Sequence, residues 1–166
     1  MTRAATTTGF DRRLGFIAIL SVAAVAVALV SQHGFGMEPC PWCVLQRTIF
    51  LAIAIVAGIG AIARSAGARA AAAALALLLA LAGIASALWQ HFYAAASASC
   101  NLTLADKILN AMQLPSLLPD VFSPRATCAD AAVDMLGIPY DFWSLALFIL
   151  VGLVTLSVLT RRRAVA

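Results

Sequence analysis

The chain has 166 residues, of which 63% are hydrophobic and only 11% are charged. Its mean hydropathy of +0.99 excludes an ordinary soluble domain and indicates an integral membrane protein. The net charge of +4 gives no reason to expect nucleic-acid binding, because the positions of the basic residues mark membrane topology instead.

Four apolar segments are long enough to cross a bilayer core, which needs about 20 helical residues. They lie at about residues 14–30, 44–63, 70–89 and 142–159. The first is longer than the apolar part of a signal peptide and no small-residue cleavage site follows it, so we expect it to be retained. The sequence therefore predicts an all-α protein, a single membrane domain over residues 1–166 folded as an up-down-up-down four-helix transmembrane bundle.

The basic residues predict the orientation of these helices, because short loops rich in Lys and Arg stay in the cytoplasm. Eight of the eleven lie at the termini or in the turn between the second and third segments: Arg3, Arg12, Arg13, Arg64, Arg69, Arg161, Arg162 and Arg163. Six of the seven acidic residues lie in the other two loops: Glu38, Asp106, Asp120, Asp130, Asp134 and Asp141. Both termini are therefore expected in the cytoplasm, with external loops at about residues 31–43 and 90–141.

The first external loop contains the stretch "EPCPWCVLQR", which places Cys40 and Cys43 in a CxxC motif. Pro41 favours a first helical turn, so the second helix is expected to begin at about Trp42 or Cys43. The macrodipole at that helix start stabilises a thiolate. Arg47 shares the helix face of Cys43. It is interpreted either as an anchor to lipid headgroups or as a charge that stabilises an anion near Cys43.

The third segment and the second loop provide further candidates. His91, at the outer end of the third segment, is either an interfacial residue or a proton donor. In the loop, Leu104, Ile108 and Met112 recur at helical spacing, which predicts a short amphipathic helix before two prolines interrupt helical structure. This helix would lie on the membrane surface or cap the bundle.

All four cysteines fall in the external loops, which indicates an oxidising compartment. A zinc site would use four thiols, but the separation of 28 positions from Cys100 to Cys128 is untypical of such a site. Structural disulfides would suit Cys100 and Cys128, whereas a ring closed by Cys40 and Cys43 would remove little chain entropy. CxxC thiols are commonly reactive, so a redox function is favoured.

This ordered combination of features resembles the disulfide bond formation protein B (DsbB) family. The resemblance is carried by "SQHGFGMEPCPWCVLQR" after the first helix, "QH" at the end of the third, "LPDVF" in the long loop and "CADAAVDMLG" before "FWSL". It runs over nearly the whole chain and includes the topology, the order of the motifs and all four cysteines. A lone CxxC would be far less specific.

The resemblance implies a quinone-dependent thiol oxidase in the bacterial inner membrane, with its redox loops in the periplasm. A periplasmic DsbA-like protein of thioredoxin fold would attack the disulfide between Cys100 and Cys128 at Cys100. Exchange would then carry electrons to the second disulfide, between Cys40 and Cys43.

On the same resemblance, Cys43 would pass two electrons to ubiquinone or menaquinone from the membrane quinone pool, with Arg47 and His91 beside the quinone. Two other functions remain open. A vitamin K epoxide reductase-like enzyme has similar parts, but its CxxC is expected late in the chain, after the lone cysteines. A membrane scaffold with structural disulfides would leave quinone absorbance unchanged when a reduced partner is added.

Overall fold

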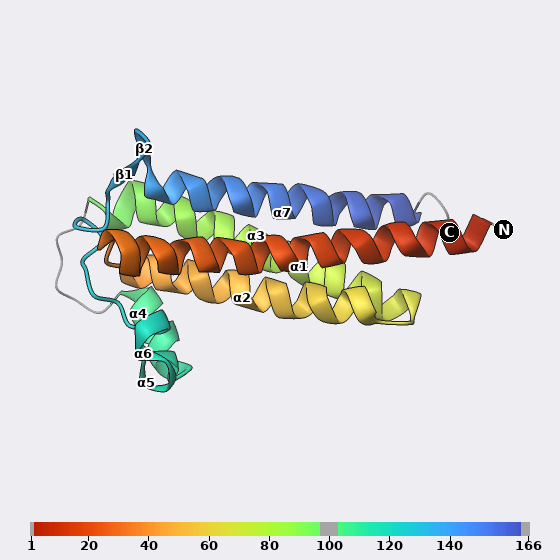
Figure 1. Ribbon diagram of the computed structural model, residues 1–166, viewed down its shortest axis with the longest axis horizontal. Coiled ribbons are helices and arrows are strands. Elements are labelled where there is room, and N and C mark those ends of the chain that lie inside the picture. Colours follow the sequence, from red (N-terminus) through yellow and green to blue (C-terminus); the bar gives the residue numbers. More distant parts are fainter. Residues whose placement is uncertain (1, 97–102, 164–166) are drawn as a thin grey trace.

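The computed structural model describes residues 2–96 and 103–163 of the chain. Over this part the long helices are α1 (Thr2–Phe35), α2 (Pro41–Ile62), α3 (Ala66–Trp89) and α7 (Tyr140–Arg163). Each runs antiparallel to the one before it, and the start of α1 and the end of α7 lie at the same end of the bundle (Figure 1). The predicted all-α four-helix bundle is confirmed.

Each long helix contains an apolar stretch that could cross a membrane. The stretches are Arg12–Phe35, Pro41–Ile62, Ala66–Ala94 and Tyr140–Thr160. α1 and α7 extend beyond the predicted segments at both ends. α2 and α3 begin a few residues earlier than predicted, and α2 ends one residue earlier. α1 ends where Gly36 adopts a φ of +66°, a left-handed conformation that glycine takes without steric cost.

The core of the bundle depends on close approach between α3 and α7. A Cβ atom placed on Gly83 would lie 2.3 Å from the ring of Phe148, so only glycine leaves room for that ring. The ring is fully buried and stacks on Phe50 of α2 at a centroid distance of 3.9 Å. Large apolar side chains such as Ile19 and Ile62 point outwards, as expected for helices that face lipid.

The loop between α3 and α7 contains short elements at the end of the bundle away from the termini (Figure 1). They are α4 (Leu104–Ala111), α5 (Leu114–Leu117), α6 (Pro119–Phe122) and a hairpin of β1 (Asp134–Met135) and β2 (Ile138–Pro139). The predicted amphipathic helix corresponds to α4, which starts with a capping box between Thr103 and Asp106. The prolines after it lie in the first turns of α5 and α6, where a missing N–H group is tolerated.

α4 packs across the outer part of α2 with one face. Leu109 is fully buried in a cluster with Val44 of α2 and Phe122 of α6. The opposite face leaves Leu104 and Met112 more than half exposed. The helix therefore caps the bundle, and its outer apolar row is of the kind that a membrane surface would cover.

Candidate redox site

The CxxC motif forms the start of α2. Cys40 is the N-cap and Pro41 the first helical residue, so the helix begins slightly before the predicted Trp42 or Cys43. The backbone N–H of Cys43 donates to Cys40 Sγ at 3.2 Å, and the two Sγ atoms lie 2.7 Å apart. A sulfur thus takes the capping role that usually falls to an oxygen, and both thiols are held on one turn.

Cys128 lies against Cys40. The second external loop crosses the first, where the backbone N–H groups of Arg125 and Ala126 donate to the carbonyl of Pro39 at 2.9 and 3.3 Å. This contact brings Cys128 into one buried cluster with Cys40. Cys100 lies outside the described residues, so its pairing with Cys128 stays a prediction.

The environments of these two thiols differ. The adjacent Cys128 sulfur raises the pKa of the Cys40 thiol, and Cys43 and burial add to this effect. Contact with Cys40 lowers the pKa of Cys128, and burial opposes this lowering. Cys40 therefore holds its proton while Cys128 favours the thiolate, which is the reactive form in disulfide exchange.

Arg47 points into the protein and not towards lipid headgroups. Its side chain is buried, with Nη1 donating to Gln32 Oε1 at 2.9 Å and to the carbonyl of Val121 at 2.7 Å. Nε has no hydrogen-bond partner among the described residues. Arg47 of α2 thus connects to both α1 and α6. Its Nε–H group can still donate a hydrogen bond to a bound molecule.

A cavity of about 750 Å³ lies beside these residues. Its walls are mainly apolar and come from α1, α2 and α7, with Leu20, Ala24, Val27, Phe50 and Leu147 among them. Its polar lining includes Cys43, Gln46, Arg47 and Gln90, whereas Cys40 and Cys128 are absent from the lining. Of the CxxC pair, Cys43 therefore faces the cavity and Cys40 faces Cys128.

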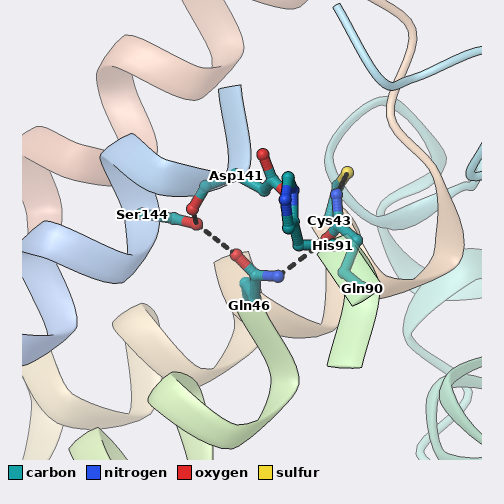
Figure 2. Close-up of polar contacts among 6 residues, drawn as sticks. All are labelled: Cys43, Gln46, Gln90, His91, Asp141 and Ser144. Atoms are coloured by element: carbon teal, nitrogen blue, oxygen red, sulfur yellow. Dashed lines mark hydrogen bonds and ion pairs between the residues drawn. The ribbon is translucent and has the colours of Figure 1, made fainter. Parts of the chain in front are cut away.

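Three polar residues connect the other helices to Cys43 (Figure 2). Gln46 contacts both Ser144 and Gln90, and Gln90 contacts Cys43. None of the three is assigned a role from the sequence. The sequence does contain a signal for them, because polar side chains within an apolar membrane span are costly to bury and commonly functional.

His91 lies in η1 (Gln90–Ala94), a π-helical turn that extends α3. Its Nδ1 lies 2.8 Å from Oδ2 of Asp141, and its ring packs against Phe142. Asp141 lines the cavity, whereas His91 is not among the lining residues. The π-turn buries Gln90 and leaves His91 partly exposed, a local change that helical periodicity does not predict.

The fold and the site define an integral membrane protein that carries out thiol–disulfide chemistry at one end of its helical bundle. The model of the family described as "Disulfide bond formation protein DsbB" matches residues 11–158. Proteins named "Disulfide bond formation protein B" are similar along most of their length. The one from Polaromonas sp. (strain JS666) is 33% identical over 153 residues, covering 90% of each chain. The one from Aromatoleum aromaticum is 36% identical over 160 residues, covering 93% of this chain and 96% of the relative.

The chain belongs to the DsbB family of inner-membrane thiol:quinone oxidoreductases, which re-oxidise DsbA during disulfide bond formation. The family resemblance seen in the sequence is thereby confirmed. Membership in this family decides for the redox function over the vitamin K epoxide reductase-like enzyme and the membrane scaffold.

Proposed function

We propose that the cavity binds the ring of a membrane quinone, ubiquinone or menaquinone, and that a periplasmic DsbA-like protein of thioredoxin fold delivers electrons through Cys100 and Cys128. The observation that carries this proposal is that Cys43 and Arg47 both line one largely apolar cavity. A redox-active sulfur, a fixed positive charge and an apolar wall are thereby combined in one place.

The residues present fit a quinone. The cavity volume of about 750 Å³ lies within the range of roughly 300–1,000 Å³ typical of small-molecule sites. Apolar walls from α1 and α7 suit a lipid-soluble ring. The unpartnered Nε of Arg47 supplies a buried donor that a quinone carbonyl would satisfy. Cys43 and Arg47 would hold the ring.

The first exchange is expected at Cys100. A thiolate of the partner would attack Cys100, form a mixed disulfide with it and release Cys128 as a thiolate. The Cys128 thiolate would then attack Cys40 Sγ, which forms a disulfide between Cys40 and Cys128, breaks the one between Cys40 and Cys43 and leaves Cys43 as the thiolate. The partner's second thiol would release Cys100, whose thiolate would attack Cys128, re-form the disulfide between Cys100 and Cys128 and free Cys40. Two features support this order: Cys128 packs against Cys40, and contact with Cys40 lowers the pKa of Cys128.

The electrons would then pass to the quinone from Cys43, the member of the CxxC pair that faces the cavity. When bound, the quinone takes up two electrons and two protons and is released as the quinol. The chain positions Cys43 at the cavity and balances its negative charge with Arg47. Over a full cycle one partner dithiol becomes a disulfide and one quinone becomes a quinol, while all four cysteines return to their starting state.

His91 is proposed to act near the quinone through Asp141. The carboxylate of Asp141 both hydrogen-bonds the imidazole and lines the cavity. The pair can therefore hold a proton at the edge of the cavity, where reduction of a quinone requires one.

To test this proposal, the purified protein is mixed with a reduced DsbA-like partner and quinone, and the consumption of quinone is measured by its absorbance. Cys43→Ala is expected to abolish quinone consumption, because the sulfur facing the cavity is lost. Cys128→Ala is expected to abolish quinone consumption, because Cys100 then has no disulfide for the partner to attack. A partner that lacks its second cysteine is expected to accumulate a mixed disulfide with Cys100 of the otherwise unaltered protein, because no partner thiol remains to release it. The control Ser116→Ala, in an exposed part of the loop, should match the unaltered protein. Full activity in Cys43→Ala would overturn the proposal.

A further inference from the structure

A chain of side-chain hydrogen bonds crosses the bundle and ends on the sulfur of Cys43 (Figure 2). The hydroxyl of Ser144 on α7 lies within hydrogen-bond distance of two acceptors, Oε1 of Gln46 on α2 and, at 2.9 Å, the carbonyl of Asp141. Its one proton goes to Oε1 of Gln46, the closer of the two. Nε2 of Gln46 donates to Oε1 of Gln90 at 2.7 Å, and Nε2 of Gln90 donates to Cys43 Sγ at 3.3 Å. Three helices are thus linked to one sulfur atom.

All the donors in this chain point the same way. A glutamine side chain has one carbonyl acceptor and one amide donor group at its end. Because Gln46 donates to the carbonyl of Gln90, the amide N–H of Gln90 is the part that faces Cys43. The hydroxyl of Ser144 fixes Gln46 in the same manner from the other side. Ser144 and Gln46 therefore set the direction of the hydrogen bond from Gln90 to Cys43.

Burial makes this arrangement hard to reverse. Gln46 and Gln90 are each only 4% exposed. Turning either amide around would leave buried polar groups unpaired, which is energetically costly. Hydrogen bonds that run in series also polarise one another in a medium of low dielectric. The donor that Cys43 meets is therefore preorganised.

Arg47 does not donate a hydrogen bond to Cys43. The hydrogen bonds of Arg47 go to Gln32 and to the carbonyl of Val121. Among the described residues, the side-chain groups that can donate to Cys43 Sγ are the thiol of Cys40, at 2.7 Å, and the amide of Gln90, at 3.3 Å. Arg47 thus supplies charge along the cavity, whereas Gln90 supplies a direct contact.

We propose that Gln90 stabilises the thiolate of Cys43 by direct hydrogen bonding, and that Gln46 and Ser144 are positioning residues that keep the Gln90 amide pointed at the sulfur. This inference rests on the proposed function, in which Cys43 is the thiolate that faces the quinone. It adds a neutral polar chain anchored on α7 to the groups that favour Cys43 as the anionic sulfur of the CxxC pair.

The test measures alkylation of a protein in which Cys43 is the sole cysteine, without quinone or partner. The rate of reaction with iodoacetamide is followed against pH, because only the thiolate reacts. Gln90→Met keeps the length of the side chain and removes its donor. The midpoint is expected to move up by about one pH unit, so that the thiolate fraction below the midpoint falls about tenfold. Ser144→Ala should move it in the same direction by less.

Ser86→Ala is the matched control. Ser86 is a buried polar residue on α3, one turn before Gln90, and among the described residues its hydroxyl bonds only to the carbonyl of Gly83 in the same helix. A midpoint for Gln90→Met equal to that of Ser86→Ala would overturn the role of Gln90. If Gln90→Met does not fold, Ser144→Ala decides, and an unchanged midpoint there would overturn the proposal.

Failure of this inference can be told apart from failure of the proposed function. The alkylation assay uses neither quinone nor partner, so a shifted midpoint supports the Gln90 contact even if no quinone is consumed. An unshifted midpoint in a protein that does consume quinone refutes the contact alone.

Discussion

Arg47 shows how one residue can be recognised from the sequence while its partners cannot. A charge about one helical turn inside an apolar segment is costly, so the sequence marks the residue as an anchor or a functional group. The structure buries the guanidinium and directs it to Gln32 and to the backbone of Val121. Neither partner could be predicted, because both contacts join segments distant along the chain.

Arg47→Met tests the charge while keeping most of the side-chain volume. We expect the apparent KM for quinone to rise by about tenfold or more, since hydrogen bonds to a charged group contribute roughly 1.5–3 kcal/mol. Exchange with the partner should persist, because Cys100 and Cys128 are unaltered. Steady-state kinetics with varied quinone, together with trapping of the mixed disulfide, separate the two effects.

Lys107→Met is the control for loss of a positive charge, because Lys107 is exposed on α4. It should leave the quinone KM unchanged. An unaltered KM and rate in Arg47→Met would refute a role of Arg47 at the quinone.

Among the elements, the first turn of α2 and the packing of α3 against α7 have different origins. Pro41 at the first helical position follows a rule that can be read from the sequence. The contact of Gly83 with Phe148 cannot be read in that way, because the two residues are far apart in the chain and depend on how the helices pair. Glycine at this point lets the two helices approach closely.

Gly83→Ala is expected to destabilise the bundle. The added Cβ would overlap the ring of Phe148, which is confined by its stacking on Phe50. Overpacking of this kind costs about 1–3 kcal/mol. The measurement is thermal unfolding of the purified protein in detergent, where Gly83→Ala should unfold at a lower temperature.

Gly15→Ala is the matched control on α1, because a Cβ at Gly15 meets nothing within 4 Å. Its unfolding temperature should not fall, since alanine has the higher helix propensity. Equal unfolding temperatures for the two variants would contradict the packing account of Gly83.

On the scale of the whole molecule, the short elements of the second external loop lie at the opposite end of the bundle from the start of α1 and the end of α7 (Figure 1). The basic residues predict that the ends face the cytoplasm. Serine-to-cysteine substitutions in a cysteine-free background test this orientation. Ser65 lies in the turn before α3 and Ser116 lies in α5, and both are exposed.

A membrane-impermeant maleimide added to bacterial cells with a permeabilised outer membrane should label Ser116→Cys. It should label Ser65→Cys only after the inner membrane is also permeabilised, because the positively charged turn stays in the cytoplasm. Labelling of Ser65→Cys alone in cells with an intact inner membrane would show that the topology is reversed.

The sequence by itself determined the membrane-crossing helices, the short helix α4, the CxxC at a helix start and the isolated charge of Arg47. These features depend on hydropathy, helical period and local capping, all of which act over a few neighbouring residues. The π-turn that buries Gln90 at the end of α3 breaks that local period, and the sequence therefore did not reveal it.

Only the tertiary structure decided which partners these residues meet. It set Cys128 against Cys40, turned Cys43 to the cavity and linked Ser144 to Cys43 through Gln46 and Gln90. Each of these contacts joins segments far apart along the chain. Such contacts depend on how whole helices and loops pack, because no periodic pattern in a single segment specifies the neighbour that it will meet.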